Sequence, residues 1–205
     1  MMMPGFTISV VDDDAGVLRA LSRLLRVNGL SIQTFSSARD FLLQHDPSVP
    51  GCAILDVSMP ELDGLRLQQE LAAQHAELAI IFITGKGDIP TGVQAMKAGA
   101  VDFLTKPVRN ADLLAAIEQA QERVAKTAVA RAQVELIKER LAKLTPREHE
   151  VLVLVVAGRL NKQIASELGT VEKTIKVHRG RMMKKMGVRT VADLVRMAEK
   201  AGIRP

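Results

Sequence analysis

The segment Cys52-Ala53-Ile54-Leu55-Asp56-Val57-Ser58-Met59-Pro60-Glu61-Leu62-Asp63-Gly64 determines the fold predicted for the first half of the chain. An apolar run of strand length ends at one carboxylate, Asp56, and a turn bounded by Pro60 and Gly64 follows at once. A strand that is apolar on both faces is typical of the buried middle of a parallel sheet. Ligands of such sheets bind beyond the carboxyl ends of the strands. Asp56 is therefore predicted to lie where an α/β protein performs its chemistry.

Apolar runs and helical patterns alternate on both sides of this segment. Four further runs have the length of strands, at residues 8–11, 31–35, 79–84 and 101–104. Helical spacing or a helix start signal follows each strand, as in residues 15–27, whose apolar side chains recur every three or four positions. Five strands alternating with helices predict a doubly wound parallel sheet with right-handed crossovers.

Side chains that suit phosphoryl transfer follow four of these strands: Asp12 and Asp13, Asp56, Thr84, and Lys106. Three carboxylates brought together repel one another and need a cation. Mg²⁺ suits them because it takes one or two carboxylates and leaves sites for water and a phosphoryl oxygen. Asp56 could then attack in line while the metal, Lys106 and Thr84 hold the equatorial oxygens.

Each of these side chains alone has an ordinary explanation, such as a solvated turn or a loop residue. Their occurrence at four strand ends favours the functional interpretation. Asp14 is predicted to be a helix N-cap rather than a ligand. The histidines at 45, 75 and 149 have no partners at metal-binding spacing, so they are predicted to be surface residues.

The half that carries these motifs resembles the receiver domain of two-component response regulators, over about 120 residues. The resemblance implies a flavodoxin-like sheet in which Asp56 accepts the phosphoryl group. It implies that Asp13 binds Mg²⁺ directly and that Asp12 acts mainly through water. The backbone carbonyl of Ser58 would be the third protein ligand.

The same resemblance assigns the switch residues. Thr84 and Lys106 would sense the phosphoryl group, and the rotamer of Phe103 would follow Thr84. Two positions depart from the family pattern: Ser58 is smaller than the basic residue often found there, and Val108 replaces a common Phe after Lys-Pro. Neither departure removes a group that phosphorylation needs, but both bear on the lifetime of the phosphorylated state or its output.

Charge separates the chain into two halves with different expected partners. Residues 1–121 carry a net charge of −5 and residues 122–205 one of +10, which predicts that the basic half meets nucleic acid or another anionic surface. The single cysteine excludes an internal disulfide and fits a cytoplasmic location. No apolar run is long enough to span a membrane, and residues 1–7 show no secretory signal. With no Trp or Tyr, a stacking platform for single strands is not expected.

Residues 112–144 contain no Pro or Gly and keep a partial helical stripe. This pattern predicts that the last helix of the first domain continues as a stiff linker, assigned to residues 122–142 between domains at 1–121 and 143–205. A short coiled coil between two copies and a solvated helix without a partner both remain open here.

The basic half begins with a capping box, in which Thr145 is the N-cap, Pro146 the first helical residue and Glu148 the third. Further helices are predicted at residues 161–168, 172–186 and 190–201, which gives an all-α unit of four helices. Two short helices around a Gly turn, the second rich in Lys and Arg, indicate a helix-turn-helix whose cationic helix enters the major groove.

This segment resembles the LuxR-type helix-turn-helix over about 60 residues, through Leu144-Thr145-Pro146-Arg147-Glu148, Asn161-Lys162-Gln163-Ile164-Ala165 and Thr174-Ile175-Lys176-Val177-His178. The resemblance places Lys176 and Val177 on bases and Lys162 and Arg179 on the DNA backbone. The full set of candidate DNA contacts is Lys162, Lys173, Thr174, Lys176, Val177, Arg179, Arg181 and Lys184. Two features depart from the family: the order Thr170-Val171 is inverted, and Gly180 occupies a mid-helix position that is often basic, at a cost of about 1 kcal/mol in helix propensity.

A receiver domain followed by a LuxR-type DNA-binding domain resembles the domain order of the NarL/FixJ class of response regulators. The resemblance implies that a sensor histidine kinase phosphorylates Asp56, with Mg²⁺ as cofactor, and that a homodimer then binds double-stranded DNA. RNA polymerase is a further candidate partner. The protein would not be an enzyme, beyond promoting its own phosphorylation and dephosphorylation. One alternative is an aspartyl-phosphate phosphatase or mutase, which would need a second carboxylate where Ser58 stands. Another is a DNA-binding protein that phosphorylation does not control.

Overall fold

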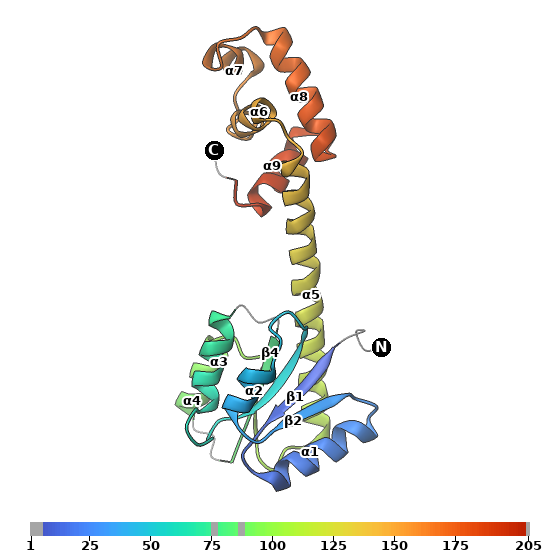
Figure 1. The fold of residues 1–205 in the computed structure, drawn as a ribbon, viewed down its shortest axis with the longest axis vertical. Coiled ribbons are helices and arrows are strands. Elements are labelled where there is room, and N and C mark those ends of the chain that lie inside the picture. The colour runs from blue at the N-terminus through green and yellow to red at the C-terminus, as the bar shows by residue number, and fades with distance from the viewer. Residues whose placement is uncertain (1–5, 75–77, 86–88, 204–205) are drawn as a thin grey trace. The chain divides into compact units, whose positions relative to one another are not determined.

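The computed structural model describes residues 6–74, 78–85 and 89–203 (Figure 1). His75 and the middle of the turn after residue 84 lie outside these ranges. The chain divides into two compact units, Met1–Thr127 and Ala128–Pro205. The division falls inside the segment 122–142 that the sequence assigned to a linker. Within the described residues, none of the helices has the length and apolar character that crossing a membrane requires.

The first unit is built on a five-stranded sheet, which confirms the predicted α/β fold. Its strands are β1 (Thr7–Val11), β2 (Ile32–Phe35), β3 (Gly51–Asp56), β4 (Leu78–Thr84) and β5 (Asp102–Thr105). All neighbouring pairs are parallel, in the order β2-β1-β3-β4-β5. Every residue of the central strand β3 is buried, as its apolar sequence predicts. Because the strands are parallel and in register, their carboxyl ends lie along one edge of the sheet.

Helices cover both faces of this sheet. They are α1 (Ala15–Val27), α2 (Ala38–Gln44), α3 (Gly64–Ala73), α4 (Ile89–Lys97) and the first part of α5 (Asn110–Ala142). One core joins α1 and α5 to alternate strand residues such as Ile54, and the other joins α2, α3 and α4 to the residues between them, such as Leu55. Successive strand residues point to opposite faces, so each apolar strand supplies both cores.

Local capping signals explain where the helices begin. The Asp14 side chain accepts hydrogen bonds from the backbone N–H groups of Gly16 and Val17, at 2.6 and 3.3 Å, which confirms its predicted role as N-cap of α1. Ser37 is the N-cap of α2, and its hydroxyl oxygen accepts the hydrogen bond from the Asp40 N–H at 3.0 Å. A hydroxyl reaches the amide three residues on when its residue directly precedes the first turn.

His45 is a further correction to the sequence analysis. It was predicted to be a surface residue, but its ring is half-buried and stacks on Phe41 with ring centroids 5.0 Å apart. Burial lowers the pKa of this imidazole because the charged form loses hydration. His149 is exposed, as expected.

The second unit is all-α, as predicted. Its helices are α6 (Pro146–Val156), α7 (Asn161–Glu167), α8 (Glu172–Met186) and α9 (Val191–Lys200), packed around one apolar core. The last turns of α5 belong to this core through the buried side chain of Ile137. Earlier in the same helix, Val124 is buried in the core of the first unit. The segment predicted as a linker thus contributes apolar side chains to both cores.

Glu148 ties the start of α6 to α8. Its backbone N–H donates to Thr145 Oγ1 at 3.3 Å, and its Oε2 accepts from the Thr145 N–H at 2.9 Å, so the predicted capping box is confirmed. The same Oε2 accepts from Lys185 Nζ of α8 at 2.5 Å. The Glu148 side chain is only 3% exposed. The hydrogen bond from Lys185 is the main cause of a pKa below the usual range for this carboxyl.

We expect Glu148→Ala to lower the free energy of unfolding of the second unit by about 1–3 kcal/mol, because it removes the reciprocal cap and leaves Lys185 without its buried partner. Urea unfolding of the full chain, followed by circular dichroism, measures the change. Glu150→Ala is the matched control, since Glu150 is half-exposed and pairs only with Arg147 in the described structure; its loss should stay below about 0.5 kcal/mol. Equal losses in the two variants would contradict the role given to Glu148.

Candidate functional site

Three of the predicted side chains meet at the carboxyl edge of the sheet. Lys106 Nζ lies 2.6 Å from Asp12 Oδ2 and 2.7 Å from Asp56 Oδ1. The side chain of Asp12 is fully buried and that of Asp56 is 6% exposed, whereas Lys106 is 24% exposed. Residues that are far apart in the sequence, directly after β1, at the end of β3 and after β5, therefore form one charged cluster. The Lys106–Pro107 peptide bond is cis.

Each of the two carboxylates is also held by the loop that follows it. Asp12 Oδ1 accepts from the Asp14 N–H at 2.9 Å, and Asp56 Oδ2 accepts from the Ser58 N–H at 2.8 Å. Both bonds run to the amide two residues further along, the pattern by which Asp closes a turn. One oxygen of each carboxylate thus faces the ammonium of Lys106 and the other is fixed by backbone.

Burial and charge act in opposite directions on this cluster. Burial raises the pKa of the Asp12 carboxyl above its ordinary value, although the hydrogen bond from Lys106 counteracts part of that effect. Burial also disfavours the charged ammonium of Lys106, but the hydrogen bonds to Asp12 and Asp56 outweigh it and raise the pKa of Lys106. Lys106 therefore stays protonated at neutral pH and supplies the positive charge of the site.

The predicted switch residues lie on β4 and β5, the two strands that follow β3 in the sheet order. Thr84 ends β4, is 1% exposed, and accepts the Lys106 N–H on its backbone carbonyl at 2.7 Å. Phe103 lies on β5 with its ring centroid 6.3 Å from that of Phe82. A Cβ added at Gly92 of α4 would stand 3.5 Å from the Phe103 ring. Phe103 therefore packs directly against the helix that borders the site.

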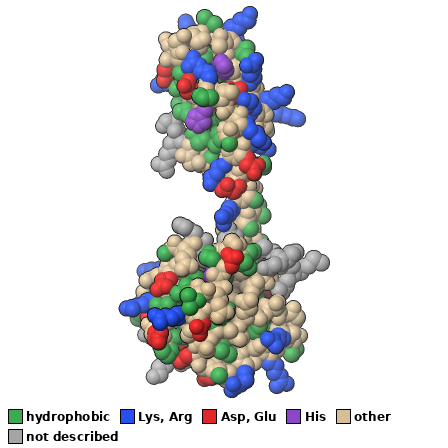
Figure 2. Space-filling model, in the orientation of Figure 1, with side chains coloured by type: hydrophobic (Ala, Val, Ile, Leu, Met, Phe, Trp, Pro, Cys, Tyr) green, Lys and Arg blue, Asp and Glu red, His purple; other side chains and the backbone are tan. Residues whose placement is uncertain are grey.

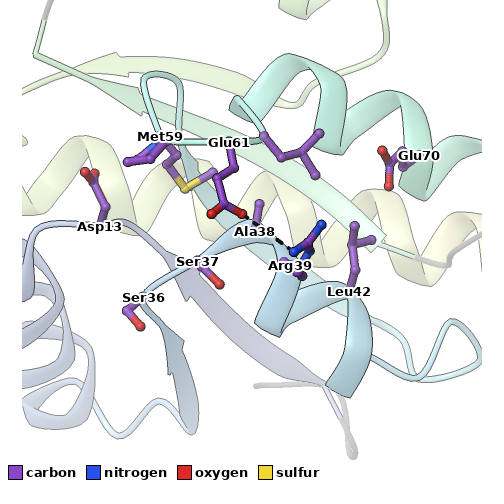
Figure 3. Close-up of a pocket in the computed structure, with 11 residues that line it drawn as sticks. Asp13, Ser36, Ser37, Ala38, Arg39, Leu42, Met59, Glu61 and Glu70 are labelled. Carbon is purple, nitrogen blue, oxygen red and sulfur yellow. Dashed lines mark ion pairs between the residues drawn. The ribbon is translucent and has the colours of Figure 1, made fainter.

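Asp13 lines a pocket of about 530 Å³ between the start of α2 and the loop after β3 (Figure 3). Its side chain is exposed. In the close-up, Asp13 stands at one end of the pocket and Glu70 at the other, with Met59 between them. Glu61 and Arg39 face each other across the opening at 3.9 Å. Glu61 has φ of 64°, and the Leu62 N–H donates to the Pro60 carbonyl at 2.7 Å, which is the hydrogen bond of a γ-turn.

The donor set of this edge fits a small hard cation. Asp12 and Asp56 converge on a single positive group, and Mg²⁺ is commonly bound by one or two carboxylates together with water. Over residues 6–74, 78–85 and 89–203, however, no group of three or more His, Cys, Asp or Glu side chains is close enough to hold a metal ion. Here the ammonium of Lys106 lies between the two carboxylates. The magnesium assignment of Asp12, Asp13, Asp56 and the Ser58 carbonyl therefore stays a prediction.

The candidate DNA interface centres on α8. Figure 2 shows Lys and Arg side chains gathered along the edge of the second unit where Figure 1 places this helix. Ile175, Met182 and Met186 bury one face of α8 in the core. The exposed residues on the other side are Lys173, Lys176, Val177, Gly180, Arg181 and Lys184, and Lys162 is exposed on α7. The structure thus exposes six of the eight predicted contacts.

The other two predicted contacts are half-buried. They are Thr174, near the start of α8, and Arg179, whose Nη1 donates to Asn161 Oδ1 at 2.8 Å. Arg179 therefore links α8 to α7 in this structure. Its contact with the DNA backbone, which the family resemblance implies, stays a prediction.

Three side-chain hydrogen bonds that no local sequence pattern predicts position α8 and α7. Lys185 binds Glu148, Arg140 Nη1 donates to the Met186 carbonyl at 2.8 Å, and Arg147 Nη2 donates to the Leu168 carbonyl at 2.6 Å. The arginines satisfy carbonyls at the ends of α8 and α7. The capping box was the only local signal for any of them, because the partners lie 21 to 46 residues apart.

Comparison with known proteins identifies a family for each of the two units. Residues 8–118 match the family described as response regulator receiver domain, and residues 142–198 match bacterial regulatory proteins of the luxR family. The chain is 48% identical to nodulation protein W of Bradyrhizobium diazoefficiens over 96% of this chain and 86% of that protein. It is 40% identical to the transcriptional regulatory protein FixJ of Azorhizobium caulinodans over 100% of this chain and 97% of that one.

Two solved structures are similar over nearly the whole chain. The response regulator StyR is 45% identical, with a TM-score of 0.79, over 95% of this chain and 98% of that one. Full-length FixJ from B. japonicum is 38% identical, with a TM-score of 0.58, over 99% of this chain and 100% of that one.

We expect Lys106→Met to destabilise the first unit by roughly 1–3 kcal/mol at pH 7 without divalent cations, because two buried carboxylates lose their shared counter-charge. Urea unfolding of the full chain measures the loss. Lys126→Met is the control, since Lys126 pairs with Glu122 at 3.3 Å where both side chains are more than 70% exposed; its effect should stay within about 0.5 kcal/mol. Coincident unfolding curves for Lys106→Met and wild type would show that the cluster contributes nothing to stability.

Proposed function

We propose that phosphorylation of Asp56 controls DNA binding by this chain, which belongs to the two-component response regulators of the NarL/FixJ class, with a receiver domain followed by a LuxR-type helix-turn-helix domain. Proteins of this class are transcriptional regulators rather than enzymes in the usual sense. The observation that best supports the proposal is the cluster in which the ammonium of Lys106 joins the buried carboxylates of Asp12 and Asp56. Such a cluster prepares one carboxylate to receive an anionic group beside a fixed cation.

The chemistry follows from the groups at this edge. A carboxylate oxygen of Asp56 would bond to the phosphorus of a phosphohistidine on a sensor histidine kinase, and the nitrogen–phosphorus bond would break. Lys106 would exchange a carboxylate oxygen for a phosphoryl oxygen, and the Thr84 hydroxyl would donate to another. Asp12, Asp13, Asp56 and the Ser58 carbonyl would hold Mg²⁺, which when bound would offset the added negative charge.

The conformational change that follows phosphorylation would extend from the site to α4 and β5. As Thr84 moves toward the phosphoryl group, it would vacate space into which Phe103 turns. Phosphate can only favour a conformation that it binds better, so the change is a shift of population between two arrangements. Phe103 lines an apolar groove together with Gly92 and Met96 of α4, which supports the proposal that this surface responds.

That surface is the proposed dimer interface. Ile89 is 83% exposed, Val93 46% and Met96 45%, and all three lie on α4. Apolar side chains so exposed on one helix are typical of a protein–protein contact. Two receivers joined through α4, β5 and α5 would bring two copies of α8 to half-sites about 34 Å apart, one turn of the DNA helix. We further propose a cytoplasmic location and contact with RNA polymerase at the promoter.

The first test is a gel shift with Asp56→Asn. The probe is a duplex enriched from random sequence by wild-type protein treated with acetyl phosphate and Mg²⁺. We expect acetyl phosphate to tighten binding by wild type by about 5- to 150-fold, the usual range of coupling between two sites, and to leave Asp56→Asn unchanged. Removing Mg²⁺ with a chelator should abolish the effect in wild type.

Asp40→Asn, at an exposed position on α2, is the matched control and should respond like wild type. If wild type and Asp56→Asn bind the duplex equally, with or without acetyl phosphate, DNA binding does not depend on phosphorylation of Asp56.

The dimer interface is tested by Val93→Asp. A charge in the middle of the exposed α4 face would be desolvated and placed near its copy in the dimer, so we expect the phosphorylated variant to stay monomeric while wild type dimerises. Light scattering coupled to gel filtration measures the mass of each. Leu43→Asp is the control, because Leu43 is also apolar and 79% exposed but lies on α2. A dimer of Val93→Asp as stable as that of wild type would place the interface elsewhere.

A further inference from the structure

Gly180 stands in the interior of α8, a helix of 15 residues, without a structural reason in the described part of the chain. Its φ is not in the positive region that favours glycine. A Cβ added there would have no heavy atom within 4 Å among its described neighbours, so no internal contact requires its absence. Glycine in a helix interior is nevertheless less favourable than alanine, because it loses more conformational entropy on folding. The reason for this residue must therefore be sought outside the domain.

The position of Gly180 on the helix suggests that reason. Lys173 lies seven residues before it, Val177 three before it and Lys184 four after it. Residues at these spacings lie on the same face of a helix. Met182, two residues further along, is fully buried on the opposite face. Gly180 is therefore at the centre of the outward stripe of α8, with cations in the turns before and after it.

The missing side chain lowers the helix surface at this point. Cα atoms lie about 2.3 Å from a helix axis and side chains extend to about 5–6 Å, so the stripe is lower at Gly180 by up to about 3 Å. Val177, one turn earlier, is 47% exposed and is the apolar residue of the stripe. Together they form a shallow apolar depression between Lys173 and Lys184.

We propose that Gly180 determines DNA sequence specificity by admitting the C5-methyl group of a thymine into this depression. The inference rests on the proposed function, because it needs α8 in the major groove. The methyl group projects into that groove and is the one apolar feature that distinguishes T·A from the other base pairs there. Val177 contacts the methyl group, while the lysines on either side bind phosphates or neighbouring base edges. A side chain at position 180 fills the depression and holds the helix away from the base.

The experiment compares Gly180→Ala and Gly180→Leu with wild type, as full-length proteins treated with acetyl phosphate and Mg²⁺. Each is used to enrich duplexes from a random library, and each is titrated against the duplex that wild type enriches. We expect Gly180→Ala to raise Tm by a few degrees, because alanine favours the helix, yet to bind the wild-type duplex about 5- to 100-fold more weakly. Gly180→Leu should bind it more weakly still, and both variants should enrich a different base pair at one position.

Two further arms identify the contact. Replacing the thymine at that position by deoxyuridine removes only the methyl group, and it should weaken binding by wild type but not by Gly180→Ala. Lys173→Ala is the control for electrostatics, since it should weaken binding to all duplexes. It should also reduce the slope of log affinity against log salt concentration by about the amount expected for one phosphate contact, whereas Gly180→Ala should leave that slope unchanged.

The inference is overturned if Gly180→Ala binds the wild-type duplex as tightly as wild type does and enriches the same sequence, or if deoxyuridine has no effect on wild type. A different result would reject the proposed function itself. In that case wild type would enrich no duplex above the random library, whatever residue stands at position 180.

Discussion

Two buried carboxylates share one ammonium, and the receiver domain depends on this arrangement. Ionised carboxylates inside a protein are costly unless a positive charge and hydrogen bonds compensate for their lost hydration. Lys106 provides the charge to Asp12 and Asp56, and backbone amides of the following loops provide the hydrogen bonds. The segments that carry these residues must therefore end at one place, which fixes the register of β1 and β3 and the path of the chain after β5.

The same constraint explains why the site is suited to control. The cluster contains one cation and two carboxylates, so in the proposed mechanism a phosphoryl group on Asp56 would offer Lys106 a new oxygen partner. A group that lies between two partners can exchange one of them without leaving its position. In the proposed mechanism, Thr84 and Phe103 change position together with this exchange, because the backbone carbonyl of Thr84 accepts a hydrogen bond from the amide of Lys106.

Most of the fold could be predicted because the deciding signals are local. The apolar run before Asp56 is buried on both faces and could only be a central strand. Once the five strands are parallel, their ends must lie on one edge, so the members of the charged cluster follow from strand ends alone. The capping residues Asp14 and Thr145 were also predictable, because each bonds to an amide within three residues.

The sequence could not show how the side chains divide between contacts inside the protein and contacts with solvent. Lysines and arginines look alike along α8, yet Lys185 turns inward to a buried glutamate while Lys184 beside it is exposed. That choice depends on where α6 crosses α8, which no local pattern encodes. His45 illustrates the same limit, since only the packing of α2 places its ring on Phe41. Exact distances within the charged cluster also depend on tertiary packing.

These internal ties bear on how phosphorylation could control the DNA-binding domain. Lys185, Arg140 and Arg147 each join α8 or α7 to another element of the second unit. The recognition helix is therefore held in place by its own domain and does not need phosphate to form. Control that acted by reshaping α8 would have to break a hydrogen bond to a buried carboxylate. Control by dimerisation breaks none of these bonds, because it changes only how many recognition helices reach the DNA together. Two linked recognition helices bind DNA more tightly than one, because once the first is bound the second meets its half-site at a high effective concentration. A receiver that changes only its pairing could therefore still produce a large change in promoter occupancy.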